Sequence, residues 1–556
     1  MLDTTTTTTT DGPPGRVEPP DPRPPLDRTV FLVAAGLALV FLAYGSLGTE
    51  SFSAGAGAAL TWITTNLGWL FVLASAGFVV FSAFLAFSRY GNIRLGDDDA
   101  TPEFSTFSWV SMMFATGMGI GLMFWGVAEP LTHLNTPPLG RAEPGSGAAA
   151  ALAMEYTFFH WGLHPWAMYA VIGLAIAYFA YRKGTGNLVS AAFGPLLGRH
   201  AEGTAGRSID VLALLATLFG SATSLGLGAL QITGGIDHIF GRGGGDKTLA
   251  VAVIAFLTLC FVISAVSGVE KGIKWLSNAN AVAAAALAFF LLVVGPTVFI
   301  LMTLTESLGG YLTHLPMMSF TLGAFGGSEW LGGWTIFYWA WWISWTPFVG
   351  MFIARISKGR TIREFVTYVI AIPSLVSFVW FAILGGSAFD LQLNQGVDMA
   401  ARLADGTESA LFTTLADYPL ASVTTVLAVV LVAIFFITGA DSASIVMGML
   451  SQRGVEEPSR WLIVFWGVAT GAVAAVLLWA GGLTALQTGV TIVATPFVLV
   501  LVGMCVSLWK ELKNEPFLST LPSAVRDHIL EHDAEKSAAI LSLQAGVVPQ
   551  DSPDLP

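Results

Sequence analysis

The sequence predicts an all-α membrane protein with twelve transmembrane helices. Its 556 residues are 54% hydrophobic and only 11% charged, whereas soluble proteins average about 25% charged residues. Apolar runs of about 20 residues, long enough to cross a hydrocarbon core of about 30 Å as a helix, recur along the whole chain. We expect membrane spans at residues 29–47, 62–86, 108–127, 156–180, 210–238, 248–267, 276–302, 334–354, 366–387, 422–449, 461–482 and 486–508.

The positions of Lys and Arg predict how these spans are oriented. Basic residues favour cytoplasmic loops, whereas acidic residues carry little topological information. If both termini are cytoplasmic, all but four of the 25 Lys and Arg fall on the cytoplasmic side; the exceptions are Arg141, Arg242, Lys247 and Arg402. We therefore expect a multi-pass protein of the cell membrane, either inner or plasma membrane, with both termini in the cytoplasm.

Composition divides the chain into three regions. Residues 1–27 combine a threonine run with repeated prolines, a composition that buries too little apolar surface to fold, so we expect a disordered cytoplasmic tail. Residues 28–509 form one twelve-helix domain in the lipid bilayer, and residues 510–556 form a cytoplasmic tail with a short helix. The net charge of −12 argues against a nucleic-acid partner, which requires a basic surface.

Two of the spans differ from ordinary lipid-facing helices. The third contains glycines at 117, 119, 121 and 126, and each glycine weakens a helix interior by about 1 kcal/mol, so we expect the helix to loosen there. The eighth contains Pro347, which favours a kink. Each begins a block of five spans, 3–7 and 8–12, which indicates an inverted five-plus-five repeat with two additional N-terminal spans. Close helix packing is the alternative use of these residues.

Aromatic residues gather on the fourth and eighth spans. Each set shares one helix face at 100° per residue; the sets are Trp161, Trp166 and Tyr169, and Trp341, Trp342 and Trp345. Two facing aromatic surfaces suit a quaternary ammonium ion, because ring quadrupoles attract a cation without any acid. The alternatives are interfacial belt residues or packing core, and a site for an aromatic or sugar substrate.

Other polar residues in the spans offer weaker candidates. Asp441 could pair with a cation inside the membrane, but neighbouring hydroxyls favour local hydrogen bonding. His160 and His164 lie one turn apart without a metal-binding pattern such as H-E-x-x-H. We therefore expect no resident cofactor and no enzyme active site.

Five segments together resemble the betaine/choline/carnitine transporter (BCCT) family over nearly the whole membrane portion. They are GMGIGLMFWGVAEP at 117–130, HWGLHPWAMYA at 160–170, SLGLGALQI at 224–232, KWLSNAN at 274–280 and YWAWWISWTPFVGMFIARISKGRTIREF at 338–365. The resemblance implies a LeuT-like inverted repeat of spans 3–7 and 8–12, alternating access, a homotrimer and a substrate with a trimethylammonium or similar cationic centre.

The same resemblance implies a substrate site. The residues expected to surround the cationic group are Trp161, Trp166, Tyr169, Trp342 and Trp345, with Trp341 at an inner or transit position. The glycine-rich segment, with Gly117, Met118, Gly119 and Gly121, would offer backbone donors to the substrate carboxylate. Choline-carrying relatives tend to have an acidic residue at the position of Gly121, so the pattern is most similar to sodium-coupled carriers of glycine betaine.

Sodium coupling is also implied by the resemblance. One ion position would use Ala115, Met118, Phe435 and Thr438, and a second would use Thr217, Ser221 and Phe348. Gly439 departs from the family pattern, because a hydroxyl residue is expected there. Ala281 occupies the position where sodium-independent exchangers have a basic residue.

We therefore expect secondary active uptake of a glycine betaine-like compatible solute, driven by sodium. Proton-coupled choline uptake and sodium-independent exchange of betaine or carnitine compounds are the alternatives within the same class. A membrane sensor that only binds a quaternary amine is the alternative from another class, and it would bind without accumulating the ligand.

Overall fold

The computed structural model describes residues 26–544 except 118, 242–245, 268–269 and 405. Residues 1–25 of the predicted N-terminal tail and residues 545–556 lie outside the described residues. Within the described part, helices are the only regular structure apart from one isolated β-bridge between Arg94 and Thr361. This confirms the all-α class.

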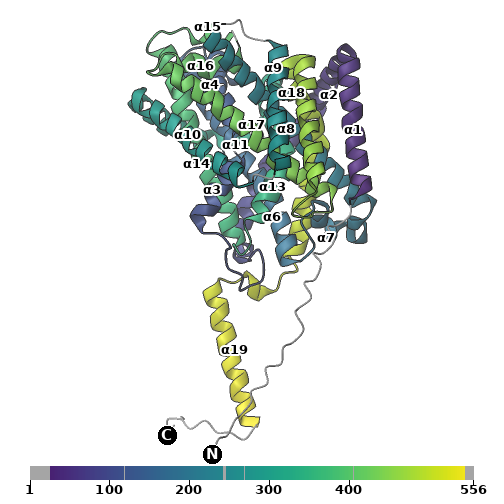
Figure 1. The fold of residues 1–556 in the computed structure, drawn as a ribbon. Coiled ribbons are helices and arrows are strands. Elements are labelled where there is room, and N and C mark those ends of the chain that lie inside the picture. Colours follow the sequence, from purple (N-terminus) through teal and green to yellow (C-terminus); the bar gives the residue numbers. More distant parts are fainter. Residues whose placement is uncertain (1–25, 118, 242–245, 268–269, 405, 545–556) are drawn as a thin grey trace, which may run out of the picture.

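The helices form a bundle whose axes run mostly along one direction (Figure 1). The longer helices are α1 (Arg28–Leu47), α2 (Thr49–Phe87), α8 (Thr204–Phe240), α9 (Lys247–Ser267), α10 (Glu270–Val294), α11 (Thr297–Phe320), α14 (Ile362–Leu393), α17 (Ala421–Ser451), α18 (Arg460–Leu512) and α19 (Ser523–Gln544). The shorter ones are α3 (Thr106–Gly117), α4 (Ile120–Asn135), α5 (Gly147–Trp161), α6 (Leu163–Ala177), α7 (Gly194–Leu197), α12 (Ser328–Leu331), α13 (Phe337–Arg355), α15 (Met399–Ala404) and α16 (Ala410–Leu415). Short 3₁₀ turns include η1 (Arg89–Asn92), η7 (Thr407–Ser409) and η8 (Phe517–Thr520), and two π-helices are η3 (Tyr178–Arg182) and η6 (Gly332–Ile336).

Nine helices among the described residues are long and apolar enough to cross a membrane, which makes the chain a multi-pass membrane protein. Each of the nine corresponds to one expected span, if α18, which contains two expected spans, is counted only for the first of them. The other three expected spans fall on the α3–α4 pair, on α13 and on the second part of α18. The number twelve therefore stays a prediction.

Helix α18 is a hairpin of two helical arms. A straight helix of its 53 residues would be about 80 Å long, far more than one membrane crossing. Gly481 and Gly482 have non-helical dihedral angles, and Gly482 has a φ of 62°, a conformation that glycine adopts without strain. A Cβ atom at Gly489 would lie 3.1 Å from Leu477 on the other side of this break, so the chain reverses direction there.

The centre of the bundle is formed by α8 and α13. Helix α8 packs against α13, α17 and α18, and α13 also packs against α6. At Gly220 of α8, an added Cβ would lie 2.5 Å from Ser344 Oγ and 2.7 Å from Trp345, so the missing side chain permits the close approach of α8 and α13. Helix α4 packs against α5 and α14, and α3 packs against α13, so the interrupted third span lies next to the aromatic fourth and eighth spans.

Candidate functional site

The third span is interrupted where the glycines cluster. Helix α3 ends at Gly117 and α4 begins at Ile120, with Gly119 in a non-helical conformation at the N-cap (φ −165°, ψ −113°). The loosening expected from the sequence is confirmed, and Met118 itself lies outside the described residues. The first amide groups of α4 have no intrahelical partners, so this helix start can bind an anionic group.

The fourth span is also interrupted, which the sequence analysis did not predict. Gly162 separates α5 from α6, and a Cβ atom there would lie 2.6 Å from the Phe158 carbonyl and 2.7 Å from the Phe378 ring. Trp161 therefore ends one helix, whereas Trp166 and Tyr169 lie on the next. In the eighth span, α13 continues through Pro347, and the irregular segment is the preceding π-helix η6.

Five of the six aromatic residues form one connected cluster. The Trp161 ring meets the Trp342 ring at 4.8 Å and 76°, and the Trp341 ring at 6.1 Å and 88°. Trp341 and Trp342 stack in parallel, with centroids 4.8 Å apart. Tyr169 contacts Trp342 at 6.4 Å and Trp166 at 5.4 Å. We call these five residues the aromatic box; all are at most 4% exposed, so the cluster is not a surface belt.

The sixth aromatic residue, Trp345, lies one turn farther along α13 and has different neighbours. Its ring packs on Phe348 at 5.6 Å and lies beside Gly220 of α8. The structure thus places Trp345 with the residues expected for the second ion position.

The start of α4 lies directly against the aromatic box. A Cβ atom at Gly121 would lie 2.8 Å from Trp161 Cη2 and 3.0 Å from Trp341 Cη2. At Gly119, the nearest side chain to an added Cβ would be Phe435 of α17, at 3.3 Å. The interrupted segment therefore has the aromatic rings on one side and the expected first ion position on the other.

A buried carboxylate connects the walls of the box, and the sequence analysis assigned it no role. Glu129 accepts hydrogen bonds from Trp161 Nε1 at 2.7 Å and from the Tyr338 hydroxyl, and it pairs with His160 Nδ1 at 2.7 Å. The backbone carbonyl of His160 in turn accepts a hydrogen bond from Trp342 Nε1 at 2.9 Å. A signal was present in the sequence, because Glu129 stands at the end of an apolar span and His133 follows it by one helical turn.

Glu129, His133 and His160 bring their ligand atoms within 4.8 Å of one another, a spacing that could hold a metal ion. However, both ring nitrogens of His160 already have partners, since Nε2 lies 3.0 Å from the Thr335 hydroxyl. His164 lies outside this group, and its Nε2 is 3.1 Å from Ser319 Oγ. The cluster is organised as a hydrogen-bonded network.

The residues expected around the first ion position lie near the helix break. On α17, Thr438 Oγ1 donates to the carbonyl of Ile434 at 3.0 Å and approaches that of Phe435 at 3.4 Å. A Cβ atom at Gly439 would meet open space. Ala115 lies in the last turns of α3, and the contribution expected from Met118 lies outside the described residues.

The residues expected around the second ion position lie where α8 and α13 meet. Thr217 and Ser221 are buried on α8, four residues apart. The Thr217 hydroxyl donates to the Ala213 carbonyl at 2.9 Å. Phe348 lies on α13 and packs on the Trp345 ring, and Trp345 in turn lies beside Gly220 of α8.

A cavity of about 330 Å³ adjoins the helix break. It extends between α4, α10, α14 and α17, and its lining includes Gly119, Met123, Ala281 and Phe435. Most of its lining is apolar, with alanines on the α10 side. Ala281, the position at which a basic residue would mark a sodium-independent exchanger, therefore faces the same cavity as Gly119.

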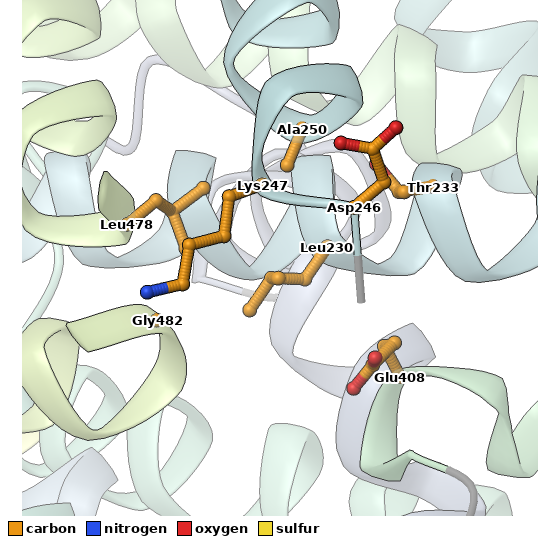
Figure 2. A pocket seen from close by; sticks show the side chains of 8 residues that line it. All are labelled: Leu230, Thr233, Asp246, Lys247, Ala250, Glu408, Leu478 and Gly482. Atoms are coloured by element: carbon orange, nitrogen blue, oxygen red, sulfur yellow. The ribbon is translucent and has the colours of Figure 1, made fainter. Parts of the chain in front are cut away.

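A separate, smaller pocket lies where α8, α9 and the bend of α18 meet (Figure 2). Its lining includes Thr233, Lys247 and Glu408, and the Lys247 side chain extends toward Gly482. Burial and the nearby charge of Asp237 raise the pKa of Glu408. The expected site residues do not line this pocket, so we do not assign it to the substrate site.

Comparison with known proteins adds an independent line of evidence. A family model described as "BCCT, betaine/carnitine/choline family transporter" matches residues 29–517. The chain is 46% identical over 491 residues to the "Probable glycine betaine transporter" of Desulfitobacterium hafniense (strain Y51), covering 88% of this chain and 98% of that protein. It is 46% identical over 490 residues to "Glycine betaine transporter OpuD" of Bacillus subtilis (strain 168), covering 88% and 94%. It is 42% identical over 496 residues to "Betaine/ectoine transporter LcoP" of Corynebacterium glutamicum, covering 88% and 78%.

Proposed function

The chain belongs to the betaine/carnitine/choline transporter family, and we propose that it takes up a trimethylammonium zwitterion of the glycine betaine type together with sodium. As a member of this family it is a membrane transporter and not an enzyme. In our proposal, twelve spans form a LeuT-like inverted repeat that works by alternating access. The protein assembles as a homotrimer in the cell membrane, with both termini in the cytoplasm.

The aromatic box carries the substrate assignment. Its indoles come from two different spans and meet at nearly right angles, which gives a cationic group more than one ring to approach. A desolvated cation–π contact contributes about 2 kcal/mol, so two or three contacts supply much of the roughly 8 kcal/mol that micromolar binding requires. The names of two similar relatives, both glycine betaine transporters, support the same substrate class.

The glycines of the interrupted third span explain the preference for a zwitterion. An anionic group at the start of α4 would interact favourably with its free amide groups and with the helix dipole. Gly121 touches the box, so the carboxylate and the ammonium group of one small molecule can be bound a few ångströms apart. Choline lacks the carboxylate and would lose the first of these interactions.

Sodium is the proposed coupling ion, bound at Ala115, Met118, Phe435 and Thr438, and at a second position with Thr217, Ser221 and Phe348. Ala281 supports this choice, because the cavity beside Phe435 has an alanine methyl group where a basic side chain could replace the ion. Because Gly439 lacks the hydroxyl group expected there, we expect the first ion position to bind sodium with low affinity.

Uptake of labelled glycine betaine into proteoliposomes, with an imposed sodium or proton gradient, tests this function. We expect accumulation that follows the inward sodium gradient and is competed by other betaines more strongly than by choline. Protein-free liposomes are the control. Uptake that ignores sodium and follows the proton gradient would replace the proposal with the proton-coupled alternative, and binding without accumulation would indicate a sensor.

A further inference from the structure

We propose that Glu129 is a positioning and specificity residue of the aromatic box, which favours a cationic head group over a neutral group of the same shape. This inference rests on the proposed function, because it concerns the same substrate site. Glu129 is fully buried on α4, and its carboxylate is the point where hydrogen bonds from α5 and α13 converge.

Glu129 fixes both walls of the box through different bonds. On α5, its bond to Trp161 Nε1 sets the plane of that indole. On α13, its bond to Tyr338 holds a ring that stacks on Trp342, with centroids 5.9 Å apart and planes at 21°. His160 provides a further link, because its side chain pairs with Glu129 and its carbonyl accepts the Trp342 indole.

The ionised carboxylate fits the donors that surround it. An ionised carboxylate only accepts hydrogen bonds, with two oxygens that together offer about four lone-pair positions. Glu129 Oε2 faces the indole N–H and the phenol O–H, and Oε1 faces His160 Nδ1 at 2.7 Å. His133 Nε2 lies farther from Oε1, at 3.4 Å. An ionised Glu129 would therefore accept all three bonds, with His160 Nδ1 as the donor to Oε1.

The negative charge also acts on the rings themselves. An indole that donates its N–H to a carboxylate gains electron density in its ring, which strengthens its attraction for a cation at the face. The carboxylate in addition attracts the cation directly, and burial makes this interaction stronger than it would be in water. Neither effect acts on an uncharged tert-butyl group, which has the same shape as trimethylammonium.

The test compares glycine betaine with 3,3-dimethylbutyrate, its uncharged-head isostere, as competitors of labelled betaine in binding to the full-length purified protein. The ratio of the two affinities isolates the contribution of the cationic charge. In Glu129→Gln we expect this ratio to fall by about tenfold, the factor that corresponds to about 1.4 kcal/mol, because the amide removes the charge and one acceptor. Glu155→Gln on α5, which removes a carboxylate that pairs with His314 outside the box, is the matched control and should keep the wild-type ratio.

A second variant protects the test against a folding defect. The amide nitrogen of Glu129→Gln could face two donors, Trp161 Nε1 and the Tyr338 hydroxyl. The double variant Glu129→Gln/Tyr338→Phe removes one of these donors. It should show the same reduced ratio of betaine to dimethylbutyrate affinity. Equal weakening of both ligands, or an unchanged ratio in either variant, would overturn the inference and leave Glu129 as a purely structural residue. Failure of the wild-type protein to bind betaine would instead refute the proposed function.

Discussion

A Cβ atom at Gly121 would lie within 3.0 Å of both Trp161 and Trp341, a distance at which side chains have to move. We therefore predict that Gly121→Ala weakens glycine betaine binding by about tenfold, because a displacement of the two indoles costs on the order of 1 to 2 kcal/mol. The measurement is the Kd for betaine of the purified variant. Gly77→Ala on α2, where an added Cβ meets open space, is the control. Equal betaine affinities in the two variants would contradict the prediction that Gly121 lies against the substrate site.

Trp342 of α13 and Trp479 of α18 differ in how deeply they are buried, and this permits a paired test. Trp342 is 4% exposed within the box, whereas Trp479 is 54% exposed on α18. Trp342→Leu should weaken betaine binding by about thirtyfold, since one desolvated cation–π contact contributes about 2 kcal/mol. Trp479→Leu should leave betaine affinity near that of the wild type. Similar uptake by the two variants at matched expression would refute the assignment of the box.

The open space at Gly439 bears on the affinity for sodium. Gly439→Ser can add a hydroxyl without steric conflict, next to Thr438 and the Phe435 carbonyl. We predict that the half-saturating sodium concentration for betaine uptake falls by about tenfold, if the hydroxyl contributes about 1.4 kcal/mol. Gly439→Ala is the steric control and should not improve sodium affinity. A lack of change in the serine variant would place the ion elsewhere.

The sequence pattern identifies five aromatic residues that the structure brings together, but it gives no role to Glu129, and the reason is distance along the chain. Trp341 and Trp342 can be recognised because indoles in the middle of an apolar span are unusual and share a face. The hydrogen-bond partners of Glu129 lie 31 to 209 residues away, and no local pattern specifies which donors will reach a given carboxylate.

At the scale of elements, the two interrupted spans show the same contrast. The break between α3 and α4 could be predicted, because three glycines within five residues weaken a helix cumulatively. The break at Gly162 could not, because a single glycine is common in membrane helices. What distinguishes Gly162 is the Phe378 ring of α14 packed against it, and that neighbour is more than 200 residues away.

One junction links the end of α18 to η3 and to the segment after η1. Arg182 donates to Glu515 at 2.7 Å, to Asp98 at 2.9 Å and to the Gly96 carbonyl at 2.9 Å. Lys183 pairs with the same Glu515 at 2.9 Å, and the Tyr178 hydroxyl donates to it at 2.5 Å. Burial alone would raise the pKa of Glu515, but the bonds from Arg182, Tyr178 and Lys183 outweigh it and lower that pKa to about 2.

A pH dependence of stability follows from this junction. Because the pKa of Glu515 is lowered in the folded protein, its contribution to stability is present above its ordinary pKa of 4.5 and is lost as the pH falls toward 2. We predict that Glu515→Gln lowers the free energy of unfolding by about 2 kcal/mol at pH 7, and that its Tm deficit relative to wild type shrinks between pH 5 and pH 3. Thermal unfolding of the purified protein measures this. The exposed Glu457→Gln is the control, and a Tm deficit that is constant with pH would contradict the prediction.

At the scale of the whole molecule, there are physical reasons why three of the twelve expected spans have no separate counterpart among the nine long apolar helices of the described residues. Helices α3 and α4 have 12 and 16 residues, so neither crosses the membrane alone. Helix α13 carries many aromatic residues whose N–H and O–H groups reduce its hydropathy. The two arms of α18 follow one another so closely that they merge into one apolar segment. The total of twelve rests on the apolar runs of about 20 residues in the sequence and stays a prediction, and the basic residues bear on its orientation.

The proposed orientation can be tested with single cysteines introduced into a chain that lacks Cys260 and Cys505. Glu457→Cys, between α17 and α18, should be protected from a membrane-impermeant thiol reagent in intact cells and become labelled after permeabilisation. Asp398→Cys, between α14 and α15, should be labelled in intact cells. The opposite pattern would reverse the topology, and labelling of both positions in intact cells would reject the expected number of crossings between them.

The hairpin of α18 has a consequence for how the chain enters the membrane during synthesis. Residues 461–509 contain no Lys, Arg, Asp or Glu, so the orienting charges, Arg460 and Lys510, stand at the two open ends of the hairpin and none stands at its turn. The first arm leaves the ribosome after Arg453 and Arg460, and Lys510 and Lys513 follow only after the second arm is complete. We therefore expect the two arms to insert into the membrane together. A nascent chain that ends at Gly482 would lack the basic residues that follow the second arm, and with them part of the charge that keeps both ends of the hairpin on the cytoplasmic side.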